Sequence, residues 1–488
     1  MSKNLAFYVV VLVLFGAGTG LLINLGSKLQ PDAASSRPAT VAQASAHHEM
    51  EGKATGGGIA HSLVENARSP LSILLLQVVL IVAAARGLGF LFRKIGQPPV
   101  IGEIIAGILL GPSLLGAVAP SAQAFLFPAS SMDALRMLSQ IGVILFMFVV
   151  GIELDVEHLR QKADAAVLVS HASIAVPFFL GTASALVIYR RLAPDGIPFS
   201  AFALFLGVTM SITAFPVLAR ILNDRRMSRS FLGSTALACA AVDDATAWCL
   251  LALVVAIVKA NGLGGAALTV VLTVLFVAGM ILVVRPRMSR LLRDLPQSQG
   301  GSVGLLAVLF TFIFASALCT EVIGIHALFG AFLAGVCMPP DSHLRQFLRA
   351  RLETFSSVLL LPLFFAFTGL RMQIGLVKGW ESWAICAGLI VVAIAGKLGG
   401  GMLAARWTGM SWGDSFSLGT LLNARGLVEL IVLNLGYDLG ILSPQVFAML
   451  VLMALVTTFM TGPLLHLRNA VGRQEAVVAA GGPESVVP

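Results

Sequence analysis

Charged residues are scarce in this 488-residue chain: Asp, Glu, Lys and Arg make up only 11% of it, whereas 57% is hydrophobic. Soluble domains carry about 25% charged residues. With a mean hydropathy of +0.92, the composition excludes a soluble globular protein and predicts an integral membrane protein. The formal net charge is +8, but the basic residues are spread over short loops between apolar runs, which argues against nucleic-acid binding.

The chain also lacks the usual signatures of enzymes and cofactor sites. Its five cysteines all lie in apolar segments without metal-ligand spacing, which indicates small buried side chains. No nucleophile–base arrangement or metal motif is visible, and the stretch after His466 has no Gly-rich nucleotide fingerprint. We therefore expect neither catalytic activity nor a cofactor.

The N-terminus begins with an apolar run, residues 5–25, preceded by Lys3. A retained anchor helix is favoured over a cleaved signal peptide, because the nearest Ala-x-Ala pattern lies far downstream at Ala44-Ser45-Ala46. Residues 26–69 are rich in Ala, Ser and Gly and are interpreted as a flexible extracytoplasmic linker. The cluster His47-His48-Glu49 within it is interpreted as solvated rather than as a metal site.

Thirteen apolar segments follow that a window of about 19 residues identifies as candidate spans. They lie near 70–92, 98–118, 135–152, 164–189, 199–222, 230–258, 263–285, 301–320, 325–340, 353–372, 381–407, 414–436 and 445–467. The expected fold is an all-α integral membrane protein. It divides into an N-terminal segment (1–69), a membrane domain (70–467) and a short cytoplasmic tail (468–488).

The loop charges predict the orientation. One set of alternating loops holds fifteen Lys and Arg residues. The opposite set holds only five: Arg190, Arg191, Lys259, Arg371 and Lys378. The positive-inside rule makes the first set cytoplasmic, so the membrane domain starts outside and ends inside.

The most informative segment is the apolar run from Ser234 to Leu253, which has Asp243 and Asp244 at its centre. Each acid at the middle of a membrane helix costs roughly 2.5–3.5 kcal/mol on insertion scales. We interpret the pair as a cation or proton site at mid-membrane. The alternative is a surface loop between two half-helices. It is disfavoured because neither Gly nor Pro flanks the pair and the apolar flanks are too short to span separately.

The spans divide as six, one and six, which inverts the second half relative to the first, as in many secondary transporters. Such folds place their sites where broken helices meet, and the fifth span of each half has a candidate break. The first is Ser211 to Pro216, which includes Thr213. Pro216 has no N–H, so the carbonyl of Ile212 loses its helical partner; a simple kink is the alternative. The second is Asn423-Ala424-Arg425-Gly426.

Lys397 lies deep in the eleventh span, between Gly396 and Gly399. A buried ammonium needs a carboxylate partner. Adjacent helical residues point about 100° apart, so one aspartate can pair with Lys397 while the other faces a cavity. The alternative is a lysine that extends to an interface, but the surrounding glycines indicate close helix packing.

Three further charges lie inside spans: Glu103, Arg425 and Glu429. Glu103 can form a structural ion pair with Arg425. Glu429 lies one turn beyond Arg425 and can pair with it along the helix instead. Both pairings stay open at the level of the sequence.

Taken together, these residues resemble the monovalent cation:proton antiporters of the second cation:proton antiporter family. That family includes bacterial sodium/proton antiporters, potassium-efflux antiporters and plant cation/proton exchangers. The resemblance spans about Pro70 to Leu467. Its matching stretches are Gly102-Glu103 through Gly111-Pro112, Ser211 through Leu222, Val242-Asp243-Asp244 with Ala247-Trp248, Lys397, and Asn423 through Leu430.

The resemblance implies a thirteen-helix inverted-repeat fold with two broken helices crossing at the midplane, a core domain, a dimerisation domain and a homodimer in a bacterial plasma membrane. It implies that Asp244 is the principal ion ligand, that Asp243 pairs with Lys397, and that polar groups near Thr213, with Ser211, complete the site. The paired aspartates with Lys397 are typical of electrogenic sodium/proton antiporters. The Asn423–Leu430 stretch is most like that of the plant exchangers, so the identity of the transported cation, Na⁺, K⁺ or Li⁺, stays open.

The expected mechanism is competition between protons and a hard cation for the same carboxylates. Desolvation and mutual repulsion favour the protonated form of neighbouring carboxylates, and hard oxygen ligands suit a hard cation. Alternating access then carries the site between the two faces. The rivals are a potassium/proton efflux antiporter, a passive cation channel, and a membrane sensor or scaffold.

Overall fold

The computed structural model describes most of the chain, with gaps in loops and at both ends. The described residues are 3–29, 66, 68–153, 163–225, 227, 230–259, 263–293, 301–339, 347–348, 350–352 and 356–479. Within them, every regular element is helical. The cluster at His47 lies outside the described residues.

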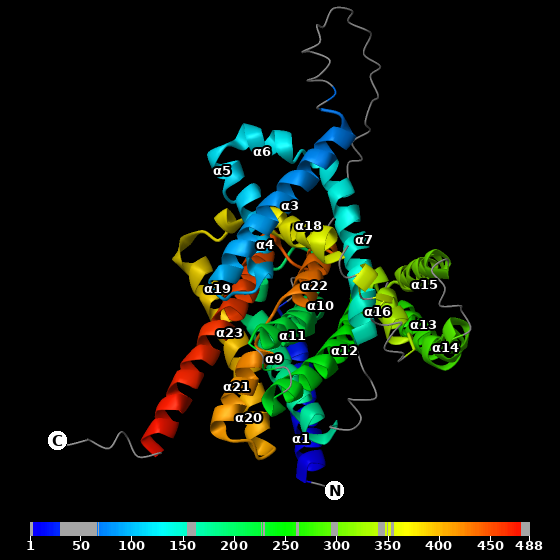
Figure 1. The fold of residues 1–488 in the computed structure, drawn as a ribbon. Coiled ribbons are helices and arrows are strands. Elements are labelled where there is room, and N and C mark those ends of the chain that lie inside the picture. Colours follow the sequence, from blue (N-terminus) through cyan, green and yellow to red (C-terminus); the bar gives the residue numbers. More distant parts are fainter. Residues whose placement is uncertain are drawn as a thin grey trace, which may run out of the picture.

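In the first half of the chain, up to Lys259, the described residues form ten helices (Figure 1). They are α1 (Lys3–Ser27), α3 (Pro70–Lys94), α4 (Pro99–Leu110), α5 (Leu115–Val118), α6 (Pro120–Leu126), α7 (Ala129–Glu153), α9 (Ala163–Leu192), α10 (Phe199–Ser211), α11 (Phe215–Asp224) and α12 (Phe231–Lys259).

The second half adds further α-helices, one 3-10 turn and three π-helical turns. They are α13 (Leu263–Gly279), η1 (Met280–Val284), α14 (Arg285–Arg293), α15 (Gly301–Ile323), α16 (Ala327–Val336), η2 (Ser356–Leu360), α18 (Leu361–Arg371), η3 (Ile374–Leu376), α19 (Gly379–Ile394), η4 (Ala395–Gly399), α20 (Gly400–Trp407), α21 (Trp412–Leu422), α22 (Leu427–Asp438) and α23 (Pro444–Ala479).

Eleven helices in the described part of the chain are long and apolar enough to cross a membrane. One is α1, and ten coincide with predicted spans of the membrane domain. The other three predicted spans are the two that break, α10–α11 and α21–α22, and the short apolar helix α16. The multi-pass helical fold is therefore confirmed. The last predicted span, 445–467, coincides with the membrane span Pro444–Leu467, and its helix α23 continues to Ala479.

The helices pack in two groups. In the first, α3 packs on α4, α4 on α18, α7 on α16 and α18, and α15 on α16. In the second, α9 packs on α10, α12, η4 and α20, while α21 packs on α12 and α20. This second group also includes α11, which packs on α12, and α23, which packs on α21 and α22. The N-terminal helix α1 adds to the second group by packing on α9 and α10. The start of α1 and the end of α23 lie at the same end of the molecule, opposite α5 and α6 (Figure 1).

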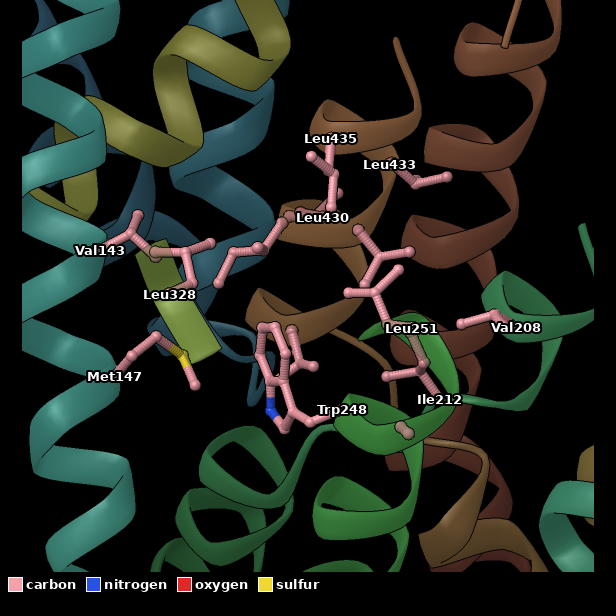
Figure 2. Close-up of a cluster of buried hydrophobic side chains, with 14 of the residues drawn as sticks. Val143, Met147, Val208, Ile212, Trp248, Leu251, Leu328, Leu430, Leu433 and Leu435 are labelled. Atoms are coloured by element: carbon pink, nitrogen blue, oxygen red, sulfur yellow. The ribbon is translucent and has the colours of Figure 1, made fainter. Parts of the chain in front are cut away.

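An apolar cluster fills the boundary between the two helix groups. Trp248 of α12 points toward Met147 of α7 and Leu328 of α16 (Figure 2). Its ring stacks on that of Phe332, with ring centroids 6.3 Å apart. These side chains are buried, so the contact between the groups at this level is made by apolar surface.

Some helices of the first group touch backbone to backbone, at glycines. A Cβ atom added to Gly335 of α16 would lie 2.2 Å from the carbonyl oxygen of Phe148 on α7. One added to Gly151 of α7 would lie 2.1 Å from the carbonyl oxygen of Phe332. Small residues permit such close approach in membranes, where van der Waals packing drives helix association.

We predict that Gly335→Ala destabilises the protein by about 1–3 kcal/mol, because the added methyl group must push two backbones apart. The matched control is Gly388→Ala on α19, where an added Cβ meets nothing within 4 Å. Thermal unfolding of the two purified variants in detergent measures the difference. Equal melting temperatures for both variants would contradict the close approach of α7 and α16.

Candidate functional site

The two aspartates lie on one continuous helix. α12 runs unbroken from Phe231 to Lys259, so the alternative of a surface loop at this point is wrong. Asp243 is 0% exposed and Asp244 is 1% exposed. Two carboxylates that are adjacent in sequence are therefore both buried, within a helix that can span a membrane.

Both predicted helix breaks are present. α10 ends at Ser211 and α11 begins at Phe215, and Ile212 between them has extended backbone angles (φ −69°, ψ 134°). Pro216 lies in the first turn of α11, where a missing N–H is tolerated, so it starts a new helix rather than kinking an old one. In the second half, Asn423–Gly426 separates α21 from α22.

The two breaks cross in direct contact. The backbone N–H of Ala214 donates to the carbonyl oxygen of Ala424 at 3.1 Å. The hydroxyl of Thr213 donates to the carbonyl oxygen of Leu422 at 3.3 Å. All four of these residues are buried, so the crossing satisfies part of the backbone that each break leaves without helical partners.

Asp243 is held by four donors from three other segments. The hydroxyl of Ser173 donates to it at 3.0 Å and that of Thr213 at 2.5 Å, while the ammonium of Lys397 lies 2.9 Å away. The hydroxyl of Ser170 donates to the other carboxylate oxygen. This carboxylate is thus neutralised and hydrogen-bonded within the protein.

Lys397 sits in the π-helical turn η4 and is 0% exposed, so the alternative that it extends to an interface is wrong. Besides Asp243, its ammonium donates to the carbonyl oxygens of Ser211 at 2.5 Å and Ser173 at 3.0 Å. Ser211 is the last residue of α10, so the lysine also satisfies a carbonyl at a helix C-terminus, where a positive charge is favoured.

Asp244 has a different environment from its neighbour. Both of its carboxylate oxygens are buried, and neither forms a hydrogen bond with any described residue. The backbone N–H of Phe215, the first residue of α11, lies near it without forming a hydrogen bond. A helix N-terminus favours negative charge, but an unpaired buried carboxylate remains costly.

Arg425, in the second break, forms the other buried ion pair. Its guanidinium donates to Glu429 at 2.8 Å and to the carbonyl oxygens of Thr209 and Met210 at 2.9 and 2.7 Å. Its backbone N–H and carbonyl both bond to the hydroxyl of Thr458 on α23. Of the two pairings left open by the sequence, the structure forms the one along the helix.

A family model described as sodium/hydrogen exchanger, transmembrane, matches residues 78–467. The chain belongs to this sodium/hydrogen exchanger family. Among similar proteins, the Na(+)/H(+) antiporter NhaS4 of Synechocystis is 44% identical over 81% of this chain and 97% of that protein. The Cation/H(+) antiporter 20 of Arabidopsis thaliana and the K(+)/H(+) antiporter 1 of Saccharomyces cerevisiae are 41% and 35% identical. The chain spans about half the length of these two, 48% and 47%.

The fold is also similar to that of a solved family structure. The sodium proton antiporter MjNhaP1 from Methanocaldococcus jannaschii matches with a TM-score of 0.60, over 83% of this chain and 98% of that one. At 12% identity this likeness concerns the fold alone. The resemblance to cation:proton antiporters drawn from the sequence motifs is confirmed.

In this exchanger, some candidate residues lie away from the aspartates. The Ser211 hydroxyl donates to the carbonyl oxygens of Gly207 and Ile174, so this residue contributes its backbone carbonyl rather than its side chain. Glu103 lies on α4 against α3, with its Cγ 3.7 Å from the position of a Cβ on Gly89.

The sequence interpretation missed the two serines of α9. Ser170 and Ser173 are three residues apart, so they lie on one face of the helix. That spacing was the available signal. It did not reveal their partner, because only the fold brings α9 against α12.

We predict that Arg425→Met lowers stability by about 3–5 kcal/mol, because it leaves Glu429 buried without its partner. The double variant Arg425→Met/Glu429→Met removes both charges and should be more stable than the single one. Thermal unfolding of the purified variants measures both effects. A single variant as stable as the unmodified protein would show that this pair does not support the crossing.

Proposed function

We propose that this chain is a secondary active transporter that exchanges a monovalent cation for protons by alternating access. The observation that supports it best is the contrast between neighbouring carboxylates. Asp243 has four hydrogen-bonding donors, whereas Asp244 is buried with no hydrogen bond from a described residue. A carboxylate in that state is stabilised by taking up a proton or a cation.

The proposed binding site consists of Asp244 as the main ligand, with Asp243 and Thr213 beside it at the crossing. Lys397 serves as the charge partner of Asp243 and as a candidate proton carrier. Carboxylate, hydroxyl and backbone carbonyl oxygens are hard ligands that suit an alkali cation. A proton and a cation then compete for the same oxygens, so binding of one displaces the other.

Na⁺ is the first candidate for the cation, with Li⁺ and K⁺ as alternatives. The relative that this chain covers almost completely is named a Na(+)/H(+) antiporter. The yeast relative is named a K(+)/H(+) antiporter, but this chain spans 47% of it. The argument for Na⁺ rests on the first of these.

We further propose that the protein lies in the plasma membrane of a bacterium, works as a homodimer, and has both the start of α1 and the end of α23 in the cytoplasm. The excess of Lys and Arg in the loops at that end supports this orientation. In this arrangement residues 70–467 form the exchanger domain.

The rival in another class is a passive cation channel. Channel filters are built from rings of carbonyls or charges, usually supplied by symmetric subunits. The buried groups here belong to one chain and include an ammonium bound to a carboxylate. That arrangement suits a carrier, in which a bound ion is exchanged rather than passed along a pore.

We predict that Asp244→Asn abolishes cation-dependent proton movement and leaves the protein folded. An amide cannot be ionised, so it cannot alternate between proton and cation. The measurement is dissipation of a pH gradient in everted vesicles on addition of Na⁺, Li⁺ and K⁺ in turn. Asp195→Asn, which changes an exposed aspartate, is the matched control. Full exchange by a well-folded Asp244→Asn protein would refute the site assignment.

The proposed exchange is electrogenic. In the empty state Asp243 and Lys397 neutralise each other, and Asp244 holds a proton. When Na⁺ binds, both aspartates can be ionised around it and Lys397 loses its partner. An unpaired buried ammonium tends to lose its proton. The loaded state would then have released two protons for one Na⁺, so a net charge crosses in each cycle.

This charge count predicts that a membrane potential drives the exchange. The test uses proteoliposomes in which K⁺ and valinomycin set the voltage. Exchange should speed up at one sign of the potential and slow down at the other. A rate that is the same at zero and at large potentials of either sign would show electroneutral exchange. The roles given to Asp243 and Lys397 would then be wrong, while an antiporter centred on Asp244 could still hold.

A further inference from the structure

A cavity of about 980 Å³ opens at the end of the molecule where α23 ends, away from the aspartates. Three segments form it: the connection between α3 and α4, the second half of α11, and the last membrane turns of α23. It therefore lies across both helix groups. Asp243, Asp244 and Lys397 do not line it.

The lining of this cavity is basic. Among the side chains that the structure describes, its charged or titratable lining residues are Arg93, Arg225 and His466, and none is acidic. Arg225 is held in place by a hydrogen bond to the carbonyl oxygen of Gly462 at 3.0 Å. These basic side chains attract an anion and repel an alkali cation.

Polar groups beyond the cations also face the cavity. Gln97 lines it and is 7% exposed, and its buried amide oxygen has no hydrogen-bond partner among the described residues. This oxygen only accepts, so it can bond to a hydroxyl group of a ligand but not to a phosphate oxygen. Pro98, also in the lining, is the N-cap of the twelve-residue helix α4 and provides no side-chain cap. The positive end of that helix dipole thus points to the same space as the arginines, an arrangement that favours anions.

We infer that this cavity binds a phosphate-bearing anion. Arginine guanidinium groups match the geometry of phosphate oxygens, and two of them approach from different helices. The remaining wall is apolar and includes Ile95, Ile221 and Leu467, so it can pack against the organic part of a phosphate ester. The volume is in the range of small-molecule sites. An anionic phospholipid and a soluble phosphate share this chemistry.

A bound anion would link the two helix groups. Arg93 ends α3 of the first group, whereas Arg225 follows α11 of the second. A ligand that binds the folded arrangement and not the unfolded chain raises the melting temperature. Thermal stability is therefore a direct readout of occupancy, and it does not depend on transport.

The test measures thermal unfolding of the full chain in phosphatidylcholine nanodiscs. In one arm inorganic phosphate is titrated against chloride at matched ionic strength. In the other, phosphatidylglycerol replaces part of the phosphatidylcholine. We expect a rise in melting temperature in at least one arm. A rise with phosphatidylglycerol alone assigns the site to a lipid headgroup, and a rise with inorganic phosphate alone assigns it to a soluble phosphate.

The variant Arg93→Gln/His466→Gln removes two exposed basic groups of the cavity. We expect this variant to need about a tenfold higher ligand concentration for the same rise in melting temperature. That change corresponds to a loss of roughly 1.4 kcal/mol in binding free energy. The control is Arg406→Gln, an exposed arginine at the end of α20 that does not line the cavity. Arg93→Gln alone should give a smaller change in the same direction.

No stabilisation of the unmodified protein in either arm would overturn the inference. So would equal stabilisation of the cavity variant and the Arg406→Gln control. Both variants should unfold at the same temperature as the unmodified protein in pure phosphatidylcholine with chloride. That baseline separates loss of the ligand from loss of the fold.

Discussion

A helix that ends inside a membrane leaves backbone carbonyls without partners, and no water is available there to satisfy them. α10 ends in this way at Ser211, and its last three carbonyls all accept hydrogen bonds from the side chains of Arg425 and Lys397. Each buried cation in turn requires an anion, which Glu429 and Asp243 supply. The broken helix and the two ion pairs therefore form one unit, in which each part satisfies groups that another part would leave unpaired.

The same unit creates the difference between the two aspartates. Because adjacent helical residues point about 100° apart, Asp243 faces α9, the first break and η4, where four donors converge on it. Asp244 faces the start of α11, with the Phe215 N–H near it. One carboxylate is thus hydrogen-bonded within the crossing, whereas its buried neighbour has no hydrogen bond from a described residue.

The features of the structure that the sequence predicted are those determined by neighbouring residues along the chain. Apolar runs predicted the spans, and Pro216 and the Asn423–Gly426 stretch predicted both breaks, because a missing N–H or a glycine acts on its own turn. The partners of the charges were not local. Ser170 and Ser173 look like ordinary small polar residues until α9 is placed against α12, and Arg425 had two glutamates within plausible reach. The choice between the two glutamates depends on which helices pack against each other, and the composition of a helix does not determine its packing partner.

The contacts that build the site all lie within the second helix group: α9, the two broken helices, α12, η4 and α23. Toward the first group, the neighbouring surface of α12 is apolar and is centred on Trp248 against Met147 and Leu328 (Figure 2). Apolar contact is non-directional, so it can re-form after a displacement, whereas the charge network cannot be opened without exposing buried ions. A rearrangement that moves the site between two faces would therefore keep the network intact and shift the second group along this apolar boundary.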